Sequence, residues 1–287
     1  MRLYDRFEGC WQRYNRALTH KVAAAREWSA FLEEDPYDAR LTMEDDGHGE
    51  LWIEQRIPVP PIIAIELGEY LYNLRAALDY CAYAVAVADG KQDPPVAEDK
   101  IQFPIYDTAQ SYRQNEKRMA SFIEKHRHWV KEIQPFMGDK SPDHYLLHWL
   151  NDLARRDRHR QLHVLGAYVS EVAPEVRAPE GAAVLFEEVA PITFVEGDVV
   201  VARFVVVPFA AGDEVEANPN LALEVEVEEI ARGRPDDARW LWFPMSKRLL
   251  VVDSFVDAVI GRFERDCLGW TRSKFVAVEG DTEGPSD

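Results

Sequence analysis

The chain has 287 residues, of which 47% are hydrophobic and 29% charged, so it can bury a sizeable core and is not a disordered polymer. Its formal net charge of −18 at pH 7 opposes general nucleic-acid binding through a basic surface. Three widely separated cysteines exclude a disulfide framework, and together with the absence of a secretory leader or an apolar run of about 20 residues they predict a cytoplasmic, non-membrane protein.

The acidity is unevenly distributed along the chain. Residues 171–237 contain 16 acidic and 4 basic side chains, which account for −12 of the −18. The arginines at 155–160 therefore belong to a chain whose negative charge lies mostly elsewhere.

Apolar periodicity predicts two long helices in the N-terminal part. Between residues 3 and 32, apolar side chains recur every three or four positions, which indicates an amphipathic helix. Alternation at 41–43 and 51–53, on either side of a turn at 45–49, predicts a β-hairpin. A proline-rich break precedes the second helix, at about 63–85, whose nearly continuous apolar surface favours the centre of a bundle.

Two further helical regions follow. The third is predicted at about 109–133, and the fourth begins after Ser141-Pro142-Asp143, which supplies a capping hydroxyl, a proline at the first helical position and an acid in the first turn.

The apolar period changes to 2 from residue 163 onward, which indicates strands. They are predicted at 163–172, 182–189, 191–197, 199–207 and 221–230, with a hairpin turn at 195–199. A final helix is predicted at about 247–267.

These elements predict an α+β fold: an N-terminal helical bundle with a β-hairpin, followed by an antiparallel β half and a C-terminal helix. The predicted units are residues 1–162, residues 163–269 and a disordered acidic tail at 270–287. Packing of the first helix on the last would join the two folded units into one. A homodimer is a further expectation, because bundles of this shape often expose a long apolar stripe.

The segment at 150–164 holds four arginines, two histidines and two aspartates at a predicted helix end. Guanidinium, imidazole and carboxylate groups at one place can hold an anion, transfer protons or neutralise one another. On the second predicted helix, Arg75 and Asp79 lie four residues apart and are placed to pair, whereas Asn73 points nearly opposite them.

The segments IELGEYLYNLRAALDYCAYAVA, IQFPIYD and HYLLHWLNDLARRDRHRQLHV, in this order, resemble a bacterial protein family without an assigned activity. Its members share GxxLHNLRSALDHLA, a short FPI segment and LNxxDKHRxL before a β-rich half. The resemblance implicates Asn73, Leu74, Arg75, Asp79, Asn151, Asp157, His159 and Arg160. The chain departs from the family at Tyr72 and Tyr80, where relatives have histidine, and at Arg158, where lysine is usual, which argues against a mechanism that uses imidazoles of the second helix.

A more distant similarity is to HEPN-type helical ribonucleases and RNA-binding toxins, which carry an arginine and a histidine four to six residues apart near a helix end. Arg158 and His163 have four residues between them. The resemblance implies RNA binding, or metal-independent RNA cleavage in which Arg158 holds the scissile phosphate and His163 or His159 moves protons.

Two alternatives stay open from the residues alone. In the first, Arg75 and Asp79 pair with Asp157, Arg158 or Arg160 in a structural clamp, and the protein is a non-catalytic ligand- or partner-binding protein. In the second, a metal ion binds residues of one helix face. The candidate ligands are His144 and His148 together with either Asp152 or His159. The RNA reading and the structural clamp need no cofactor. Whether the chain is an enzyme depends on which of the three readings holds.

Overall fold

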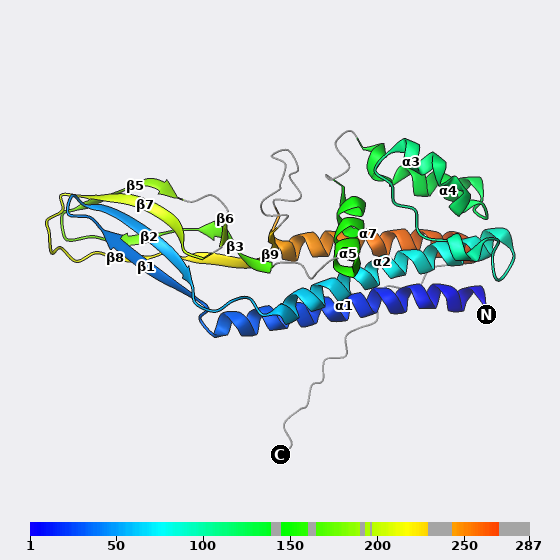
Figure 1. The fold of residues 1–287 in the computed structure, drawn as a ribbon, viewed down its shortest axis with the longest axis horizontal. Coiled ribbons are helices and arrows are strands. Elements are labelled where there is room, and N and C mark those ends of the chain that lie inside the picture. The colour runs from blue at the N-terminus through cyan, green and yellow to red at the C-terminus, as the bar shows by residue number, and fades with distance from the viewer. Residues whose placement is uncertain (139–144, 160–164, 190–192, 196, 229–242, 270–287) are drawn as a thin grey trace, which may run out of the picture.

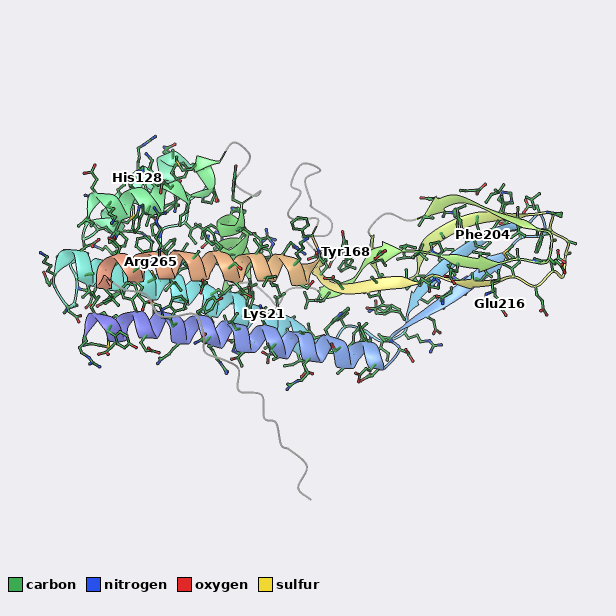
Figure 2. The ribbon with its side chains drawn as sticks, turned by 180° about the vertical axis from the view of Figure 1, so that it is seen from behind. Lys21, His128, Tyr168, Phe204, Glu216 and Arg265 are labelled. Carbon is green, nitrogen blue, oxygen red and sulfur yellow. The ribbon has the colours of Figure 1, made fainter. Side chains whose placement is uncertain are left out.

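The protein has a mixed α+β fold with N-terminal helices, antiparallel sheets and a C-terminal helix. The computed structural model describes residues 1–138, 145–159, 165–189, 193–195, 197–228 and 243–269. The molecule is elongated, with helices at one end and strands at the other (Figure 1). Seen from behind, Phe204 and Glu216 lie in the strand-rich end, and His128 and Arg265 in the helical end (Figure 2).

The helical end is built around α2 (Pro61–Gly90). Proline at its first position suits a helix start, because the missing N–H has no helical partner there in any case. Helix α1 (Leu3–Glu33) lies along it, and α5 (Leu146–His159) and α7 (Met245–Leu268) pack against it as well. Half of the residues of α2 are buried, on most sides of the helix, as its apolar sequence predicts.

The third helical region is not one helix. It consists of α3 (Ala109–Gln114), a 3-10 turn η2 (Glu116–Met119) and α4 (Glu124–Glu132). Asn115 ends α3, and its side-chain amide donates to the Ser111 carbonyl at 2.8 Å. Asparagine favours helix ends because its amide competes with the helical hydrogen bonds, and this local effect outweighs the apolar periodicity.

The strands form three antiparallel groups. The first sheet has the order β1-β2-β7-β5, the second β6-β3-β9, and β4 pairs with β8. Their bounds are β1 Tyr37–Met43, β2 His48–Gln55, β3 Leu165–Val172, β4 Glu175–Arg177, β5 Ala183–Val189, β6 Thr193–Val195, β7 Val199–Val207, β8 Glu216–Asn218 and β9 Leu221–Val227. The five predicted strands of the second half are confirmed within a few residues, and the short β4 and β8 are additional.

A second core lies between the first two sheets. Its buried members come from β2 and β7 on one side and from β3 and β6 on the other: Leu51, Ile53, Ala167, Val169, Val195, Val201 and Ala202. The predicted hairpin turn at 195–199 is therefore wrong, because β6 pairs with β3 while β7 pairs with β2 and β5. The chain passes between sheets at this point.

The predicted division at residue 162 does not follow the packing. The hairpin β1–β2 joins the strand-rich half through the β2–β7 ladder, and α7 joins the helical half. The first and last helices do pack together, with Trp11 Nε1 donating to Glu264 Oε2 at 2.9 Å. Each half is thus assembled from segments that lie far apart in the sequence. Among the described residues, no helix combines the length and apolar character of a membrane span.

A buried ion pair connects the two halves where β9 leads toward α7. Arg248 and Glu226 pair with each other, and both side chains are fully buried. The Arg248 Nε donates to the Phe243 carbonyl at 2.9 Å, and the guanidinium lies over the Trp149 ring at 5.7 Å. A buried charge is tolerated only with such partners, because desolvation of an unpaired ion costs several kcal/mol.

Arg248→Met should lower the free energy of unfolding by about 3–5 kcal/mol, because it leaves the Glu226 carboxylate buried without its cation. The double variant Arg248→Met/Glu226→Leu should be more stable than Arg248→Met, since it removes both charges. Arg203→Met, in a surface pair with Glu50 and Glu188, serves as control and should cost much less than Arg248→Met, because water screens the exposed charges. Urea denaturation measures all three; equal losses for Arg248→Met and Arg203→Met would contradict the assignment.

Candidate functional site

Arg75 is the centre of a polar cluster between α2, α5 and the segment that follows α2. Its Nε donates to Asn151 Oδ1 at 3.3 Å, its Nη2 donates to the Phe103 carbonyl at 2.9 Å, and its Nη1 binds Asp79 Oδ1. The same Asp79 oxygen accepts the Phe103 N–H at 2.8 Å. The Arg75–Asp79 pair thus holds both backbone polar groups of Phe103, as a neighbouring strand would.

The local sequence explains this arrangement. Arg75 and Asp79 are one helical turn apart, so their side chains emerge on the same side of α2. Phe103 and Pro104 lie in an extended segment in which the peptide groups need partners from side chains. Gln134 supplies two more such bonds, to the Pro104 carbonyl at 2.8 Å and from the Tyr106 N–H at 3.0 Å.

Of the sequence-predicted site residues, the structure brings Arg75, Asp79 and Asn151 together. Asn73 lies apart from them and faces α1, where its Oδ1 accepts from Arg13 Nη1 at 3.3 Å. The remaining predicted residues cannot be placed in the site. The backbone of Asp157, Arg158 and His159 continues α5, but their side chains lie outside the described residues, as do Arg160 and His163 entirely.

The histidine face of α5 does not form a metal site among the described side chains. His148 Nδ1 lies 2.8 Å from Asp107 Oδ1, whereas Asp152 pairs with Arg155 at 3.3 Å and Arg156 at 2.8 Å. His144 and the His159 side chain are outside the described residues.

A cavity of about 560 Å³ opens beside the Arg75 cluster, between α1 and α2. It is lined by Met1, Asp5, Arg6, Gly9, Gln12, Asp79, Tyr80, Tyr83 and Ile101. Asp79 is therefore shared between the cavity and the cluster. Its Oδ1 binds Arg75 and Phe103, whereas its Oδ2 forms no hydrogen bond with the described residues.

The charged groups around this cavity are mostly neutralised. Arg6 pairs with Asp93, which holds the pKa of that carboxyl below its ordinary value, and its guanidinium stacks on the Tyr83 ring at 4.8 Å. Arg13 lies 5.3 Å from the centre of the Tyr80 ring. Burial, followed by the neighbouring Glu98, raises the pKa of Tyr83, so its ring is neutral at pH 7.

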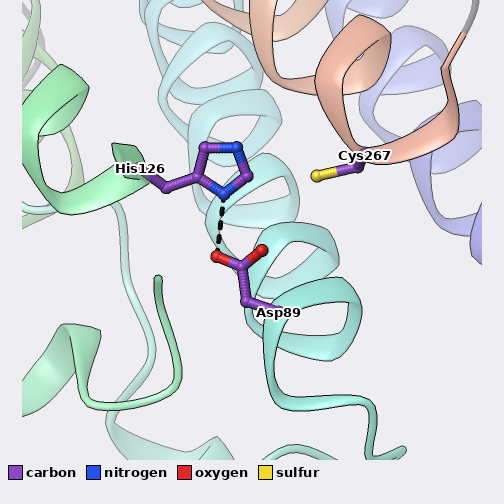
Figure 3. Close-up of side chains that lie close together, drawn as sticks. All are labelled: Asp89, His126 and Cys267. Carbon is purple, nitrogen blue, oxygen red and sulfur yellow. Dashed lines mark hydrogen bonds and ion pairs between the residues drawn. The ribbon is translucent and has the colours of Figure 1, made fainter. Parts of the chain in front are cut away.

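A second cluster, which the sequence reading missed, lies where the ends of α2 and α7 meet α4. Asp89, His126 and Cys267 each place a potential ligand atom within 4.8 Å of the others (Figure 3). Burial raises the pKa of the Cys267 thiol to about 12. The three residues are single positions on separate helices, and no spacing in the sequence connects them.

No protein-family model matches the chain, and no curated protein or solved structure matches it.

Arg75→Met should lower the free energy of unfolding by about 3 kcal/mol, because the Phe103 carbonyl and the Asp79 carboxylate lose a charged donor. Arg155→Met is the matched control on an exposed pair, and it should change stability by about 0.5 kcal/mol or less. A double-mutant cycle with Asn151→Ala should give a coupling of about 1 kcal/mol. Equal costs for the two arginines in chemical denaturation would show that Arg75 is not a clamp.

Proposed function

We propose that the chain is a non-catalytic binding protein in which Arg75, Asp79 and Asn151 form a structural clamp. The observation that supports this most directly is that all three guanidinium nitrogens of Arg75 bind protein acceptors, on α2, α5 and the Phe103 backbone. These bonds use three of the five N–H groups of Arg75 and anchor its guanidinium to three parts of the protein. Asp79 belongs both to the clamp and to the wall of the cavity. The clamp therefore holds this part of the ligand-binding surface in place.

The chemistry of the cavity indicates a small ligand with an aromatic ring and a cationic amine. The rings of Tyr80 and Tyr83 supply flat apolar contacts and attract cations through their faces. The Asp79 Oδ2 is an acceptor without a hydrogen-bond partner among the described residues. Because Arg6 is paired with Asp93, it does not repel a cation as a free arginine would. A cavity of about 560 Å³ is within the usual size of small-molecule sites.

Tyramine should raise the Tm of the protein in a thermal-shift titration, and its uncharged analogue 4-ethylphenol should have a much smaller effect. Gly9→Leu should abolish the tyramine effect, because a Cβ at Gly9 already lies 3.4 Å from the Tyr80 ring and a longer side chain enters the cavity. Gly261→Leu is the matched control, since it lies in α7 with no atom within 4 Å of its Cβ and gains the same helix propensity. An identical response of wild type and Gly9→Leu would contradict this cavity as the binding site.

RNA cleavage is the second candidate function. The observation in its favour is that α5 stays helical through His159, so the segment that carries Arg158 and His163 begins at a helix end, as in the HEPN resemblance. In this reading the chain is a metal-independent ribonuclease or RNA-binding module of the cytosol. A cytosolic location also agrees with its cysteines, Cys10, Cys81 and Cys267, which form no disulfide in the described part of the chain.

A nuclease assay separates the two functions. We expect mixed RNA to stay intact with the wild-type protein, and an Arg158→Ala/His163→Ala variant to behave in the same way, because binding in the cavity requires no general acid or base. The measurement is gel analysis of labelled RNA at equal protein concentrations. Cleavage by the wild type that the double variant loses would replace the binding proposal with the nuclease.

A further inference from the structure

The Asp89–His126–Cys267 cluster joins three helices at the end of the bundle farthest from the sheets. Asp89 lies at the end of α2, His126 on α4 and Cys267 near the end of α7 (Figure 3). The His126 side chain is 1% exposed and that of Asp89 is 5% exposed. The His126 and Asp89 side chains are thus almost closed to bulk water, and an unpaired charge is costly in such a buried place.

Both ring nitrogens of His126 face carboxylate oxygens. Its Nδ1 lies 2.8 Å from Asp89 Oδ2, and its Nε2 lies 3.0 Å from Asp266 Oδ2. A neutral imidazole has only one N–H, so one of these contacts would set a nitrogen lone pair against a carboxylate. The ring nitrogen without the N–H can therefore bind a metal cation together with the carboxylate that faces it.

The surroundings favour Nδ1 as the position of that cation. In the tautomer whose Nε2–H donates to Asp266, the Nδ1 lone pair is directed at Asp89. Asp89 Oδ2 also accepts the Ile123 N–H at 2.9 Å, while its Oδ1 accepts no hydrogen bond from the described residues. Figure 3 shows the Cys267 sulfur beside this oxygen and the ring, so three donor atoms of different kinds converge.

We propose that His126 Nδ1, Cys267 Sγ and a carboxylate oxygen of Asp89 bind a zinc ion. An imidazole, a thiolate and a carboxylate form a ligand set typical of zinc, whereas magnesium and calcium select oxygen ligands alone. Ligand atoms of a tetrahedral zinc lie about 3.3–3.8 Å apart. The ligand atoms of the present group all lie within 4.8 Å of one another, so the widest separation shortens by about 1 Å on binding. The Nδ1–Asp89 Oδ2 distance of 2.8 Å is shorter than a ligand separation, so it lengthens or Asp89 binds through Oδ1. Water occupies the fourth position.

Asp266 is a positioning residue in this site. A histidine that binds zinc through one nitrogen commonly donates its other N–H to a carboxylate, and the Nε2–Asp266 contact of 3.0 Å has this form. Asp266 also pairs with Lys125, which holds its carboxylate beside His126. The thiol proton of Cys267 passes to solvent when the metal binds.

Zinc at this position stabilises the packing of α4 on the long helices. Asp89 already orients the start of α4 through the Ile123 N–H, and Cys267 comes from the end of α7. An ion bound by three elements stabilises the folded chain, because the unfolded chain does not hold these ligands together.

Cobalt(II) titration tests the site in tag-free, full-length protein that has been treated with EDTA and dialysed. Wild type should bind one equivalent and develop the thiolate-to-cobalt charge-transfer band, which zinc then removes by displacement. Cys267→Ser should lose the band. His128→Gln, an exposed histidine of the same helix α4, should retain it. A folded wild type without the band, or a band that survives in Cys267→Ser, would overturn the proposal.

Asp266→Asn separates positioning from ligation. This variant keeps all three ligands, so it should retain the charge-transfer band while its zinc affinity falls roughly 10- to 100-fold. The readout is competition with a zinc-binding dye. Zinc should also raise the Tm of wild type but not of Cys267→Ser. Unchanged affinity in Asp266→Asn would contradict its positioning role, and an equal Tm response in wild type and Cys267→Ser would contradict the site itself.

Discussion

The fold depends on the enclosure of α2. A helix that is apolar around most of its circumference is stable in water only when other elements cover it, and α1, α5 and α7 do so. Because α1 and α7 come from opposite ends of the chain, this one requirement brings the termini of the folded region together. It also explains why the helical half is not a continuous stretch of sequence.

The few polar side chains of α2 determine how the remaining segments attach to it. Arg75 and Asp79 bind the backbone of Phe103, and Asp89 binds the first peptide N–H of the α4 region at Ile123. At both places a side chain on a rigid helix satisfies peptide groups of a segment that lacks regular partners. Hydrogen bonding is common to both places, and each belongs to a candidate site, since Asp79 lines the cavity and Asp89 belongs to the histidine cluster.

The strand-rich half is attached in a similar way from several parts of the chain. The hairpin β1–β2 lies between α1 and α2 in the sequence, yet it completes a sheet with β7 and β5. The buried Arg248–Glu226 pair then fixes α7 to β9 at the boundary between halves. The helices and sheets are therefore joined both by the chain and by this pair between α7 and β9.

The sequence by itself determined the elements that depend on local periodicity. The long helices, the hairpin and the five strands of the second half appear close to their predicted bounds, since burial of one face leaves a period of 3.6 or 2 in the residues. The Arg75–Asp79 pair could also be predicted from the sequence, because its members are one helical turn apart. The break at Asn115 was missed, since one side-chain hydrogen bond outweighed a periodic pattern.

Only the tertiary structure decided which distant elements meet. It placed the hairpin in the sheet of β7, separated β6 from β7, and brought Asn151 to Arg75. It also assembled Asp89, His126 and Cys267 from three helices. Such contacts follow from the packing of whole apolar faces, which sets distances between residues far apart in the chain and leaves no periodic or spacing signal at the individual positions.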